Sequence, residues 1–208
     1  MRLVVLGATG GTGQEVVRQA VEQGHRVTAL VRTPESLKKL GHRIVVVQGD
    51  LLNLAELERV TAGHDAVLSG FGPRLPVSRK DASLLRQFAA GLTGAMLNTG
   101  VRRLVIVSVA FLFRNSIIPP AYLLGRLFFP GIVADAAAME KVMEQSRLDW
   151  TIVRPPKLTD KSLTRKYRVG EGHLPRFGFS ISRADVADFM LKAVKDQATV
   201  GKIFGVCN

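Results

Sequence analysis

The fold of this chain is decided by the stretch Gly7-Ala8-Thr9-Gly10-Gly11-Thr12-Gly13. An apolar run over residues 3–6 precedes it, and a helix-like pattern over residues 14–22 follows it. A strand, a glycine turn and a helix in this order form a seat for a phosphate group, because the N–H groups and the dipole at the start of a helix attract an anion. The stretch is therefore predicted to bind a nucleotide.

The glycines of this turn have the spacing G-x-x-G-x-x-G, one residue wider than the G-x-G-x-x-G dinucleotide fingerprint. Gly7 would permit a sharp turn, Gly10 a close approach of a pyrophosphate, and Gly13 close packing of the helix on the sheet. Thr9 and Thr12 offer hydroxyls for helix capping or for phosphate oxygens. An ordinary tight turn is the alternative, but the position at the first strand-to-helix junction of an alternating chain favours a nucleotide site.

Outward from the turn, the 208 residues alternate between strand and helix patterns and contain no repeat or linker. We expect an α/β fold, a Rossmann-type doubly wound and mostly parallel sheet, in a single domain over 1–208 with a small C-terminal substrate-side segment from residue 158. The run 44–47 has the composition of a strand buried on both faces. Strands are predicted at 3–6, 25–31, 43–47, 65–69, 103–107, 150–153 and 202–206. Helices are predicted at 14–22, 34–40, 54–60, 83–98 and 132–145, and after the N-cap Ser182.

Two polar residues follow the second and third predicted strands. Arg32 stands where an acidic residue would bind the ribose hydroxyls of NAD, and its guanidinium can pair with a 2′-phosphate, so NADP is favoured. A solvated arginine at a strand end is the alternative. Asp50 would lie at the same crevice and accept the adenine amino group, or it would cap the helix at 54–60.

The later strands end in residues that would face the nicotinamide and the substrate. Gly70 and Phe71 begin a glycine-rich loop, continued by Arg74, that would pass beneath the pyrophosphate and the nicotinamide ribose. Ser108 follows the fifth strand and is the candidate catalytic residue. Phe111 and Phe113 form either a substrate-pocket wall or ordinary core. Pro155 begins a segment over the nicotinamide end, and Lys157 could pair with acidic groups of a substrate.

Composition narrows the function classes. The net charge of +12 favours anionic partners, which include nucleic acid, a phosphorylated dinucleotide and a carboxylate-bearing substrate. The basic residues are spread along the chain and no nucleic-acid-binding motif accompanies them, so no dedicated nucleic-acid site is predicted. The single Cys207 predicts neither a disulfide nor a metal site and favours a reducing compartment, the cytoplasm. Prolines and charges interrupt the apolar region 104–133, so no membrane span is predicted. The oligomeric state is left open, with a monomer as one option.

These motifs resemble the atypical short-chain dehydrogenases/reductases, the NmrA-like NAD(P)-binding group, and within it the branch of flavin and biliverdin-IXβ reductases. The resemblance covers nearly the whole chain. It is carried by the glycine stretch together with Leu30-Val31-Arg32, Gly49-Asp50, Asp65-Ala66-Val67, Ala110-Phe111-Leu112, Pro155-Pro156, Ile181-Ser182 and Asp188-Phe189-Met190-Leu191.

The resemblance implies that NADP(H) is the cofactor. The glycine turn and the arginine after the second strand would hold it, and the segment after the fifth strand would lie beside the nicotinamide. The implied cofactor residues are Thr9, Gly10, Gly11, Thr12, Arg32, Asp50, Leu51, Arg74, Ser108 and Val109.

The acid/base pair Tyr-x-x-x-Lys of the tyrosine-dependent branch has no counterpart here, because its nearest approach, Tyr122 to Arg126, lacks the lysine. Reduction of a ketone needs a positioned acid, whereas a conjugated ring delocalises the charge of a hydride and takes its proton from water. The resemblance therefore predicts an NADPH-dependent reductase of flavins or linear tetrapyrroles. The alternative is a non-catalytic NADP(H)-binding redox sensor or scaffold of the NmrA-like type.

Overall fold

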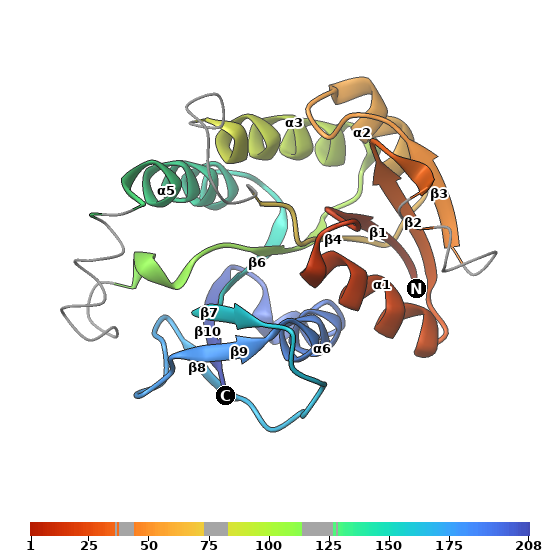
Figure 1. Ribbon diagram of the computed structural model, residues 1–208. Helices are drawn as coiled ribbons and strands as arrows, with labels where there is room; N and C mark the ends of the chain where they lie inside the picture. The colour runs from red at the N-terminus through yellow and green to blue at the C-terminus, as the bar shows by residue number, and fades with distance from the viewer. Residues whose placement is uncertain (36, 38–43, 73–82, 114–126, 128) are drawn as a thin grey trace.

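The computed structural model describes the chain except residues 36, 38–43, 73–82, 114–126 and 128. Its centre is a sheet with the strand order β3-β2-β1-β4-β5-β6-β10-β8, in which only β8 is antiparallel to its neighbour (Figure 1). The strands of this sheet are β1 Arg2–Leu6, β2 Arg26–Val31, β3 Ile44–Gln48, β4 Ala66–Ser69, β5 Arg103–Val107, β6 Asp149–Arg154, β8 Arg168–Glu171 and β10 Lys202–Cys207.

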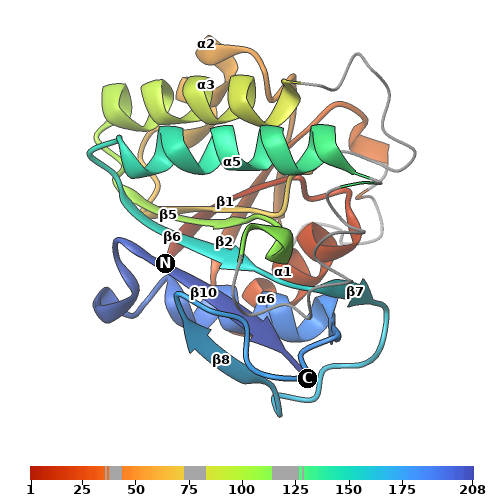
Figure 2. The same cartoon turned by 90° about the vertical axis from the view of Figure 1, so that its left-hand side faces the viewer.

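Helices cover both faces of the sheet, as Figures 1 and 2 show. One face carries α1 (Gly11–Glu22) and α6 (Arg183–Ala193), and the other carries α2 (Leu54–Thr61), α3 (Leu84–Thr99) and α5 (Pro130–Glu144). Side chains of a strand alternate between two cores, so Leu3 and Val5 face α1 and α6 while Val4 and Leu6 face the other layer. This arrangement confirms the predicted α/β, doubly wound, mostly parallel fold.

The edge strand β3 departs from its prediction. The run 44–47 looked buried on both faces, but Val45 is 60% exposed and Gln48 is also exposed. The reason is position, because β3 pairs with β2 alone and lies at the end of the strand order. The prediction of burial on both faces was wrong. The helix predicted at 34–40 lies largely outside the described residues.

The C-terminal substrate-side segment contains three short strands. Strands β7 (Lys157–Thr159) and β9 (Ser180–Ser182) form a separate parallel pair. Strand β8 lies between β7 and β9 in the sequence, but it belongs to the main sheet, where it pairs with β10. Short 3-10 helices cover Ala110–Leu112 (η3) and Gln197–Thr199 (η4).

Two buried carboxylates of α6 hold this segment in place. Asp185 accepts hydrogen bonds from the Thr164 hydroxyl, from the backbone N–H groups of residues 164 and 165, and from Asn208. Asp188 accepts a hydrogen bond from the Tyr167 hydroxyl at 2.7 Å and pairs with Lys192 at 2.6 Å. Burial raises the pKa of both carboxyl groups, but these hydrogen bonds outweigh it, so each pKa lies below its usual value.

Several large apolar side chains are exposed, among them Leu127, Phe177 and Phe179. Phe177 also has a positive φ of 59°, which is strained for a residue with a side chain. Most of the apolar segment 111–133 lies outside the described residues. Within the part that is described, no helix combines the length and the apolar character that crossing a bilayer requires.

Candidate functional site

The glycine turn joins β1 to α1 by direct backbone contact. Gly7 has φ +73°, and a Cβ added at Gly13 would lie only 2.1 Å from the Gly7 carbonyl oxygen. The loop after β4 crosses the same point, because a Cβ added at Gly7 would lie 2.6 Å from the backbone nitrogen of Phe71. The turn and the start of the Gly70–Phe71 loop are therefore packed together with no room for side chains between them.

Within the part of the chain that the structure describes, no side chain caps the N-terminus of α1. Its N-cap is Gly10, and neither Thr9 nor Thr12 fills the capping role that their hydroxyls could have taken. A helix start without a cap leaves N–H groups and the positive end of the dipole available to an anion. The local geometry thus fits a phosphate group.

The turn lies where the strand order reverses. Strand β1 pairs with β2 on one side and with β4 on the other. The chain continues from β1 to β2 and β3 on the first side, and then from β4 to β5 and β6 on the second. In doubly wound sheets, ligands bind in the crevice outside the carboxyl ends of the strands at such a reversal. Arg32 directly follows β2 and is exposed at this edge.

Asp50 is exposed and forms a local turn. Its carboxylate accepts the N–H of Leu52 at 3.1 Å, and its own N–H donates to Glu56. The cap of α2 is Asn53, whose side chain accepts the N–H of Glu56. The capping role considered for Asp50 was therefore wrong, because the helix starts after Asn53. Leu51 is half-buried against the core under α2 and α3.

The segments after β5 and β6 are held together at the same edge of the sheet as the turn. Ser108 N–H donates to the Val153 carbonyl at 2.7 Å, and Ala110 N–H donates to the Pro155 carbonyl at 3.1 Å. Ser108 is only 7% exposed, and its hydroxyl has no hydrogen-bond partner among the described residues. A buried hydroxyl without a partner costs free energy, so it marks a place where a ligand could supply the missing partner.

Phe113 is buried with Leu174 and Cys207 and lies 4.6 Å from the Arg154 guanidinium. Arg154 in turn pairs with Glu140, a buried residue of α5. Of the two roles predicted for Phe113, a substrate-pocket wall or ordinary core, its position in this structure is that of a core residue. Phe111 is half-buried in η3 and Val109 packs against the core of the other layer.

The remaining predicted residues lie on other elements or outside the described residues. Lys157 is exposed on β7, where it pairs with Ser180 of β9. The ring of Phe71 packs at a tilt against that of Phe88, with the centroids 4.6 Å apart. Arg74 and the pair Tyr122 and Arg126 lie outside the described residues.

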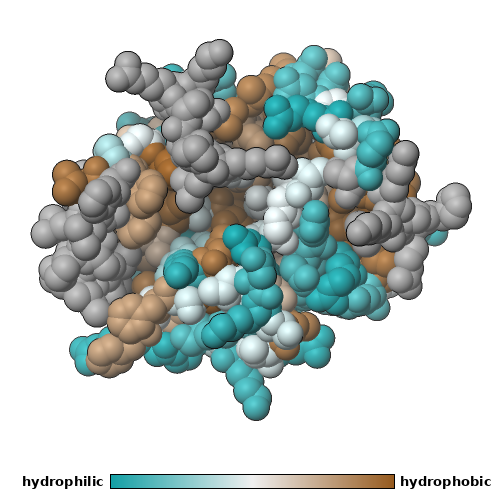
Figure 3. Space-filling view, in the orientation of Figure 1, coloured by the Kyte–Doolittle hydropathy of each residue, from teal (hydrophilic) through white to brown (hydrophobic). Residues whose placement is uncertain are grey.

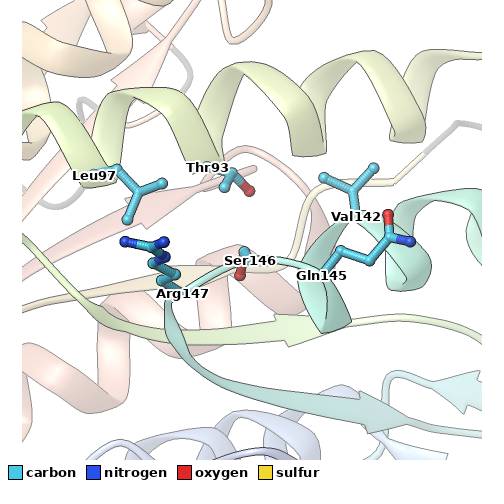
Figure 4. A pocket seen from close by; sticks show the side chains of 6 residues that line it. All are labelled: Thr93, Leu97, Val142, Gln145, Ser146 and Arg147. Atoms are coloured by element: carbon cyan, nitrogen blue, oxygen red, sulfur yellow. The ribbon is translucent and has the colours of Figure 1, made fainter.

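Figure 3 views the molecule from the side of the glycine turn, in the orientation of Figure 1. The surface is hollowed near its centre, where brown and white atoms are recessed between teal side chains. A second hollow, of about 610 Å³, lies between α3 and α5 (Figure 4). It contains none of the predicted site residues, being lined by Thr93, Leu97, Val142, Gln145, Ser146 and Arg147.

Sequence reasoning missed two arginines near the site. The Arg154 guanidinium joins Glu140 to Phe113. Arg183 lies against Gly11, at the start of α1. No local pattern could have identified these contacts, because each joins residues of different elements that only the folded sheet brings together.

Comparison with known families gives an extended match. A sequence model of a family described as NAD(P)H-binding matches residues 7–197. An uncharacterized chloroplastic protein of Arabidopsis thaliana is 30% identical over 211 residues, which cover 97% of this chain and 75% of that protein. The photosystem II assembly factor Ycf39 of Synechocystis is 25% identical over 222 residues, and this chain spans 62% of its length.

Solved structures share the fold. A Rossmann-fold NAD(P)-binding family protein from Shigella flexneri has a TM-score of 0.73 and 25% identity, with 99% of this chain and 93% of that chain covered. A short-chain dehydrogenase/reductase from Veillonella parvula in complex with NADP has a TM-score of 0.84 at 19% identity, covering 100% and 94%. ChuY, an anaerobillin reductase from Escherichia coli O157:H7, has a TM-score of 0.82 at 19% identity, covering 100% and 97%.

Proposed function

Because this chain belongs to the NAD(P)H-binding family, we propose that it is an NADPH-dependent reductase that transfers a hydride to a conjugated ring. Flavins and linear tetrapyrroles are the substrate classes we propose. The observation that carries the proposal is the buried hydroxyl of Ser108, which has no described partner and follows β5 at the crevice edge. We also propose that residues 1–208 act as one domain, in the cytoplasm, on a small molecule.

The cofactor would be held by residues at the carboxyl ends of β1, β2 and β4. The uncapped start of α1 would bind the pyrophosphate through backbone N–H groups, and Arg32 would pair with the 2′-phosphate. Asp50 would accept the adenine amino group. The proposed cofactor residues also include Gly7, Thr9, Gly10, Gly11, Thr12, Gly13, Leu51, Gly70, Phe71, Arg74, Val109 and Pro155.

NADPH supplies a hydride when it is bound. A conjugated ring spreads the incoming negative charge, so the chain need not hold a proton donor at the reacting atom. Ser108 would then orient the nicotinamide or the ring through a hydrogen bond. Positioning of two rings against each other supplies much of the rate in such a site.

The substrate would be recognised by its flat apolar body and its acidic groups. Phe111 offers a half-buried ring beside the segment of Ser108. Lys157 is exposed on β7 and pairs in register with Ser180, next to the exposed Phe179. An exposed cation suits a ring substrate that carries propionate or phosphate groups.

The second candidate is a non-catalytic NADP(H)-binding sensor or scaffold. It is favoured by the likeness to Ycf39, which is named as an assembly factor and matches over 99% of this chain. The lack of a Tyr-x-x-x-Lys pair agrees with both functions. Binding of NADPH without turnover would distinguish the sensor from the reductase.

The test is NADPH oxidation, followed by absorbance, with riboflavin, FMN, biliverdin and a quinone as acceptors. Steady oxidation with a flavin or a bilin, and loss of that activity in Ser108→Ala, would support the reductase. Tight NADPH binding without oxidation by any of these acceptors would contradict it and support the sensor. Because NADPH affinity is measured separately, a failure of binding and a failure of chemistry are told apart.

A further inference from the structure

The side chain of Arg183 lies across the start of α1. A Cβ added at Gly11 would lie 2.6 Å from Cδ and 2.8 Å from Nε of Arg183. Gly11 therefore leaves the space that the arginine fills. The guanidinium extends beyond this point to Asp160, with 2.5 Å between Nη1 and Oδ1.

The backbone of Arg183 is fixed by the packing of α6 on α1. Gln19 of α1 donates to the Ala184 carbonyl at 2.8 Å, and Ser182 caps α6 by accepting the Asp185 N–H at 2.9 Å. The Arg183 side chain is 29% exposed, whereas that of Asp160 is 88% exposed. The arginine is thus held at the turn by the fold, and its acidic partner is the more exposed member of the pair.

Two positive groups meet at this place, the start of α1 and the Arg183 guanidinium, and Asp160 pairs with the second of them. The start of an α-helix carries a positive partial charge, so a guanidinium beside it is repelled unless an anion lies between them. Asp160 supplies one negative charge, but an exposed ion pair contributes little stability. Among the described residues no side chain caps α1, so a second anion has both a helix start and a guanidinium available to it.

We propose that Arg183 is a ligand of the cofactor pyrophosphate, supplied to the turn from α6, and that Asp160 competes with the pyrophosphate for it. This inference rests on the proposed cofactor site. It adds a side-chain charge to a site otherwise built from backbone N–H groups. Asp160 follows β7, the strand that carries Lys157. Competition between Asp160 and the pyrophosphate for Arg183 therefore also connects the cofactor to that strand.

The experiment compares binding of NADP and of 2′-AMP, which keeps the adenine and the 2′-phosphate but lacks the pyrophosphate. Arg183→Met retains methylenes that can pack on Gly11 and removes the charge. We expect NADP to bind at least about tenfold more weakly to this variant, as loss of a charged hydrogen bond predicts, and 2′-AMP to bind within twofold of the wild type. Arg102→Met, which removes an exposed arginine before β5, is the matched control and should change neither affinity.

Equal losses for both ligands, or no loss for NADP, would overturn the proposal. Asp160→Asn is the second variant, and it keeps the guanidinium while removing its competitor. It should tighten NADP by up to about fivefold and leave 2′-AMP unchanged, whereas unchanged or weaker NADP binding would contradict the competition. If the wild type binds neither ligand, the proposed cofactor site itself is contradicted. If the wild type binds NADP and Arg183→Met binds it equally well, only the role of Arg183 is contradicted.

Discussion

Glu140 and Arg154 form a buried ion pair that joins α5 to the carboxyl end of β6. Both oxygens of the carboxylate accept from the guanidinium, and the side chains are only 4% and 12% exposed. The other side of the guanidinium lies over the Phe113 ring. The pair therefore links the helix layer to the segment that follows β5.

The first prediction concerns this pair. Glu140→Ala leaves Arg154 charged and buried without its partner, so we expect a loss of about 3–5 kcal/mol in the free energy of unfolding, measured by urea denaturation. The double variant Glu140→Met with Arg154→Met removes both charges and should be more stable than Glu140→Ala alone. A single variant as stable as the wild type would show that the pair does not hold this layer.

The second prediction concerns the glycine turn. In Gly13→Ala the new methyl group would lie 2.1 Å from the Gly7 carbonyl oxygen, so α1 must move away from β1. We expect both a lower melting temperature and a loss of NADPH affinity, measured by calorimetry. Gly91→Ala in α3 is the control, because its Cβ would meet only Leu57 at 3.6 Å. That variant should be as stable as the wild type or more stable, since alanine favours a helix.

The third prediction concerns Arg32. If its guanidinium pairs with the 2′-phosphate, Arg32→Ala should weaken NADPH by about tenfold or more and leave NADH within twofold. Titrations of both nucleotides against the same protein preparation give this ratio. Equal losses for the two nucleotides would mean that the side chain does not contact the extra phosphate.

The fourth prediction concerns Ser108. Its hydroxyl has no described partner, so Ser108→Ala should unfold at the same or a higher temperature while NADPH oxidation falls. Thr93→Val is the matched control, because the Thr93 hydroxyl is also buried without a described partner but lies at the hollow between α3 and α5. That variant should keep full activity. A serine variant that loses stability and activity together would point to a structural role.

The fifth prediction concerns acid. The pKa of Asp188 is lower in the folded protein than its usual value, because hydrogen bonds from Lys192 and Tyr167 outweigh the effect of burial. A carboxyl group of this kind stabilises the fold fully above its unfolded pKa of about 4, and the stabilisation is lost as the pH falls through the folded value. The free energy of unfolding should therefore drop below about pH 4. Asp188→Asn should reduce that dependence, and an unchanged pH profile would contradict the assignment.

The sequence predicted the architecture well because its signals are local. Glycine spacing, apolar runs and the Ser182 cap each depend on neighbouring residues, and the structure confirms the sheet and the cap. The error at β3 concerns neighbours in space. The composition of β3 matches a central strand, and only the strand order reveals that it lies at the edge.

The candidate site divides in the same way. The glycine turn could be identified from sequence, because its residues are contiguous. Arg183 could not, because its contact with Gly11 depends on how α6 packs on α1. Asp50 is a different case. Asp50 and Asn53 are both acceptable N-caps for α2, and residue type alone does not choose between them.

Strand β10 lies between β6 and β8 and pairs with both. Until residues 202–207 have emerged from the ribosome, a growing chain holds β6 with an unpaired edge and β8 with no sheet to join. Nascent chains stopped before this point should bind chaperones and be cleaved readily by proteases, whereas chains extended past residue 207 should be abruptly protected. Completion of this sheet thus waits for a strand that follows both of its neighbours in the sequence.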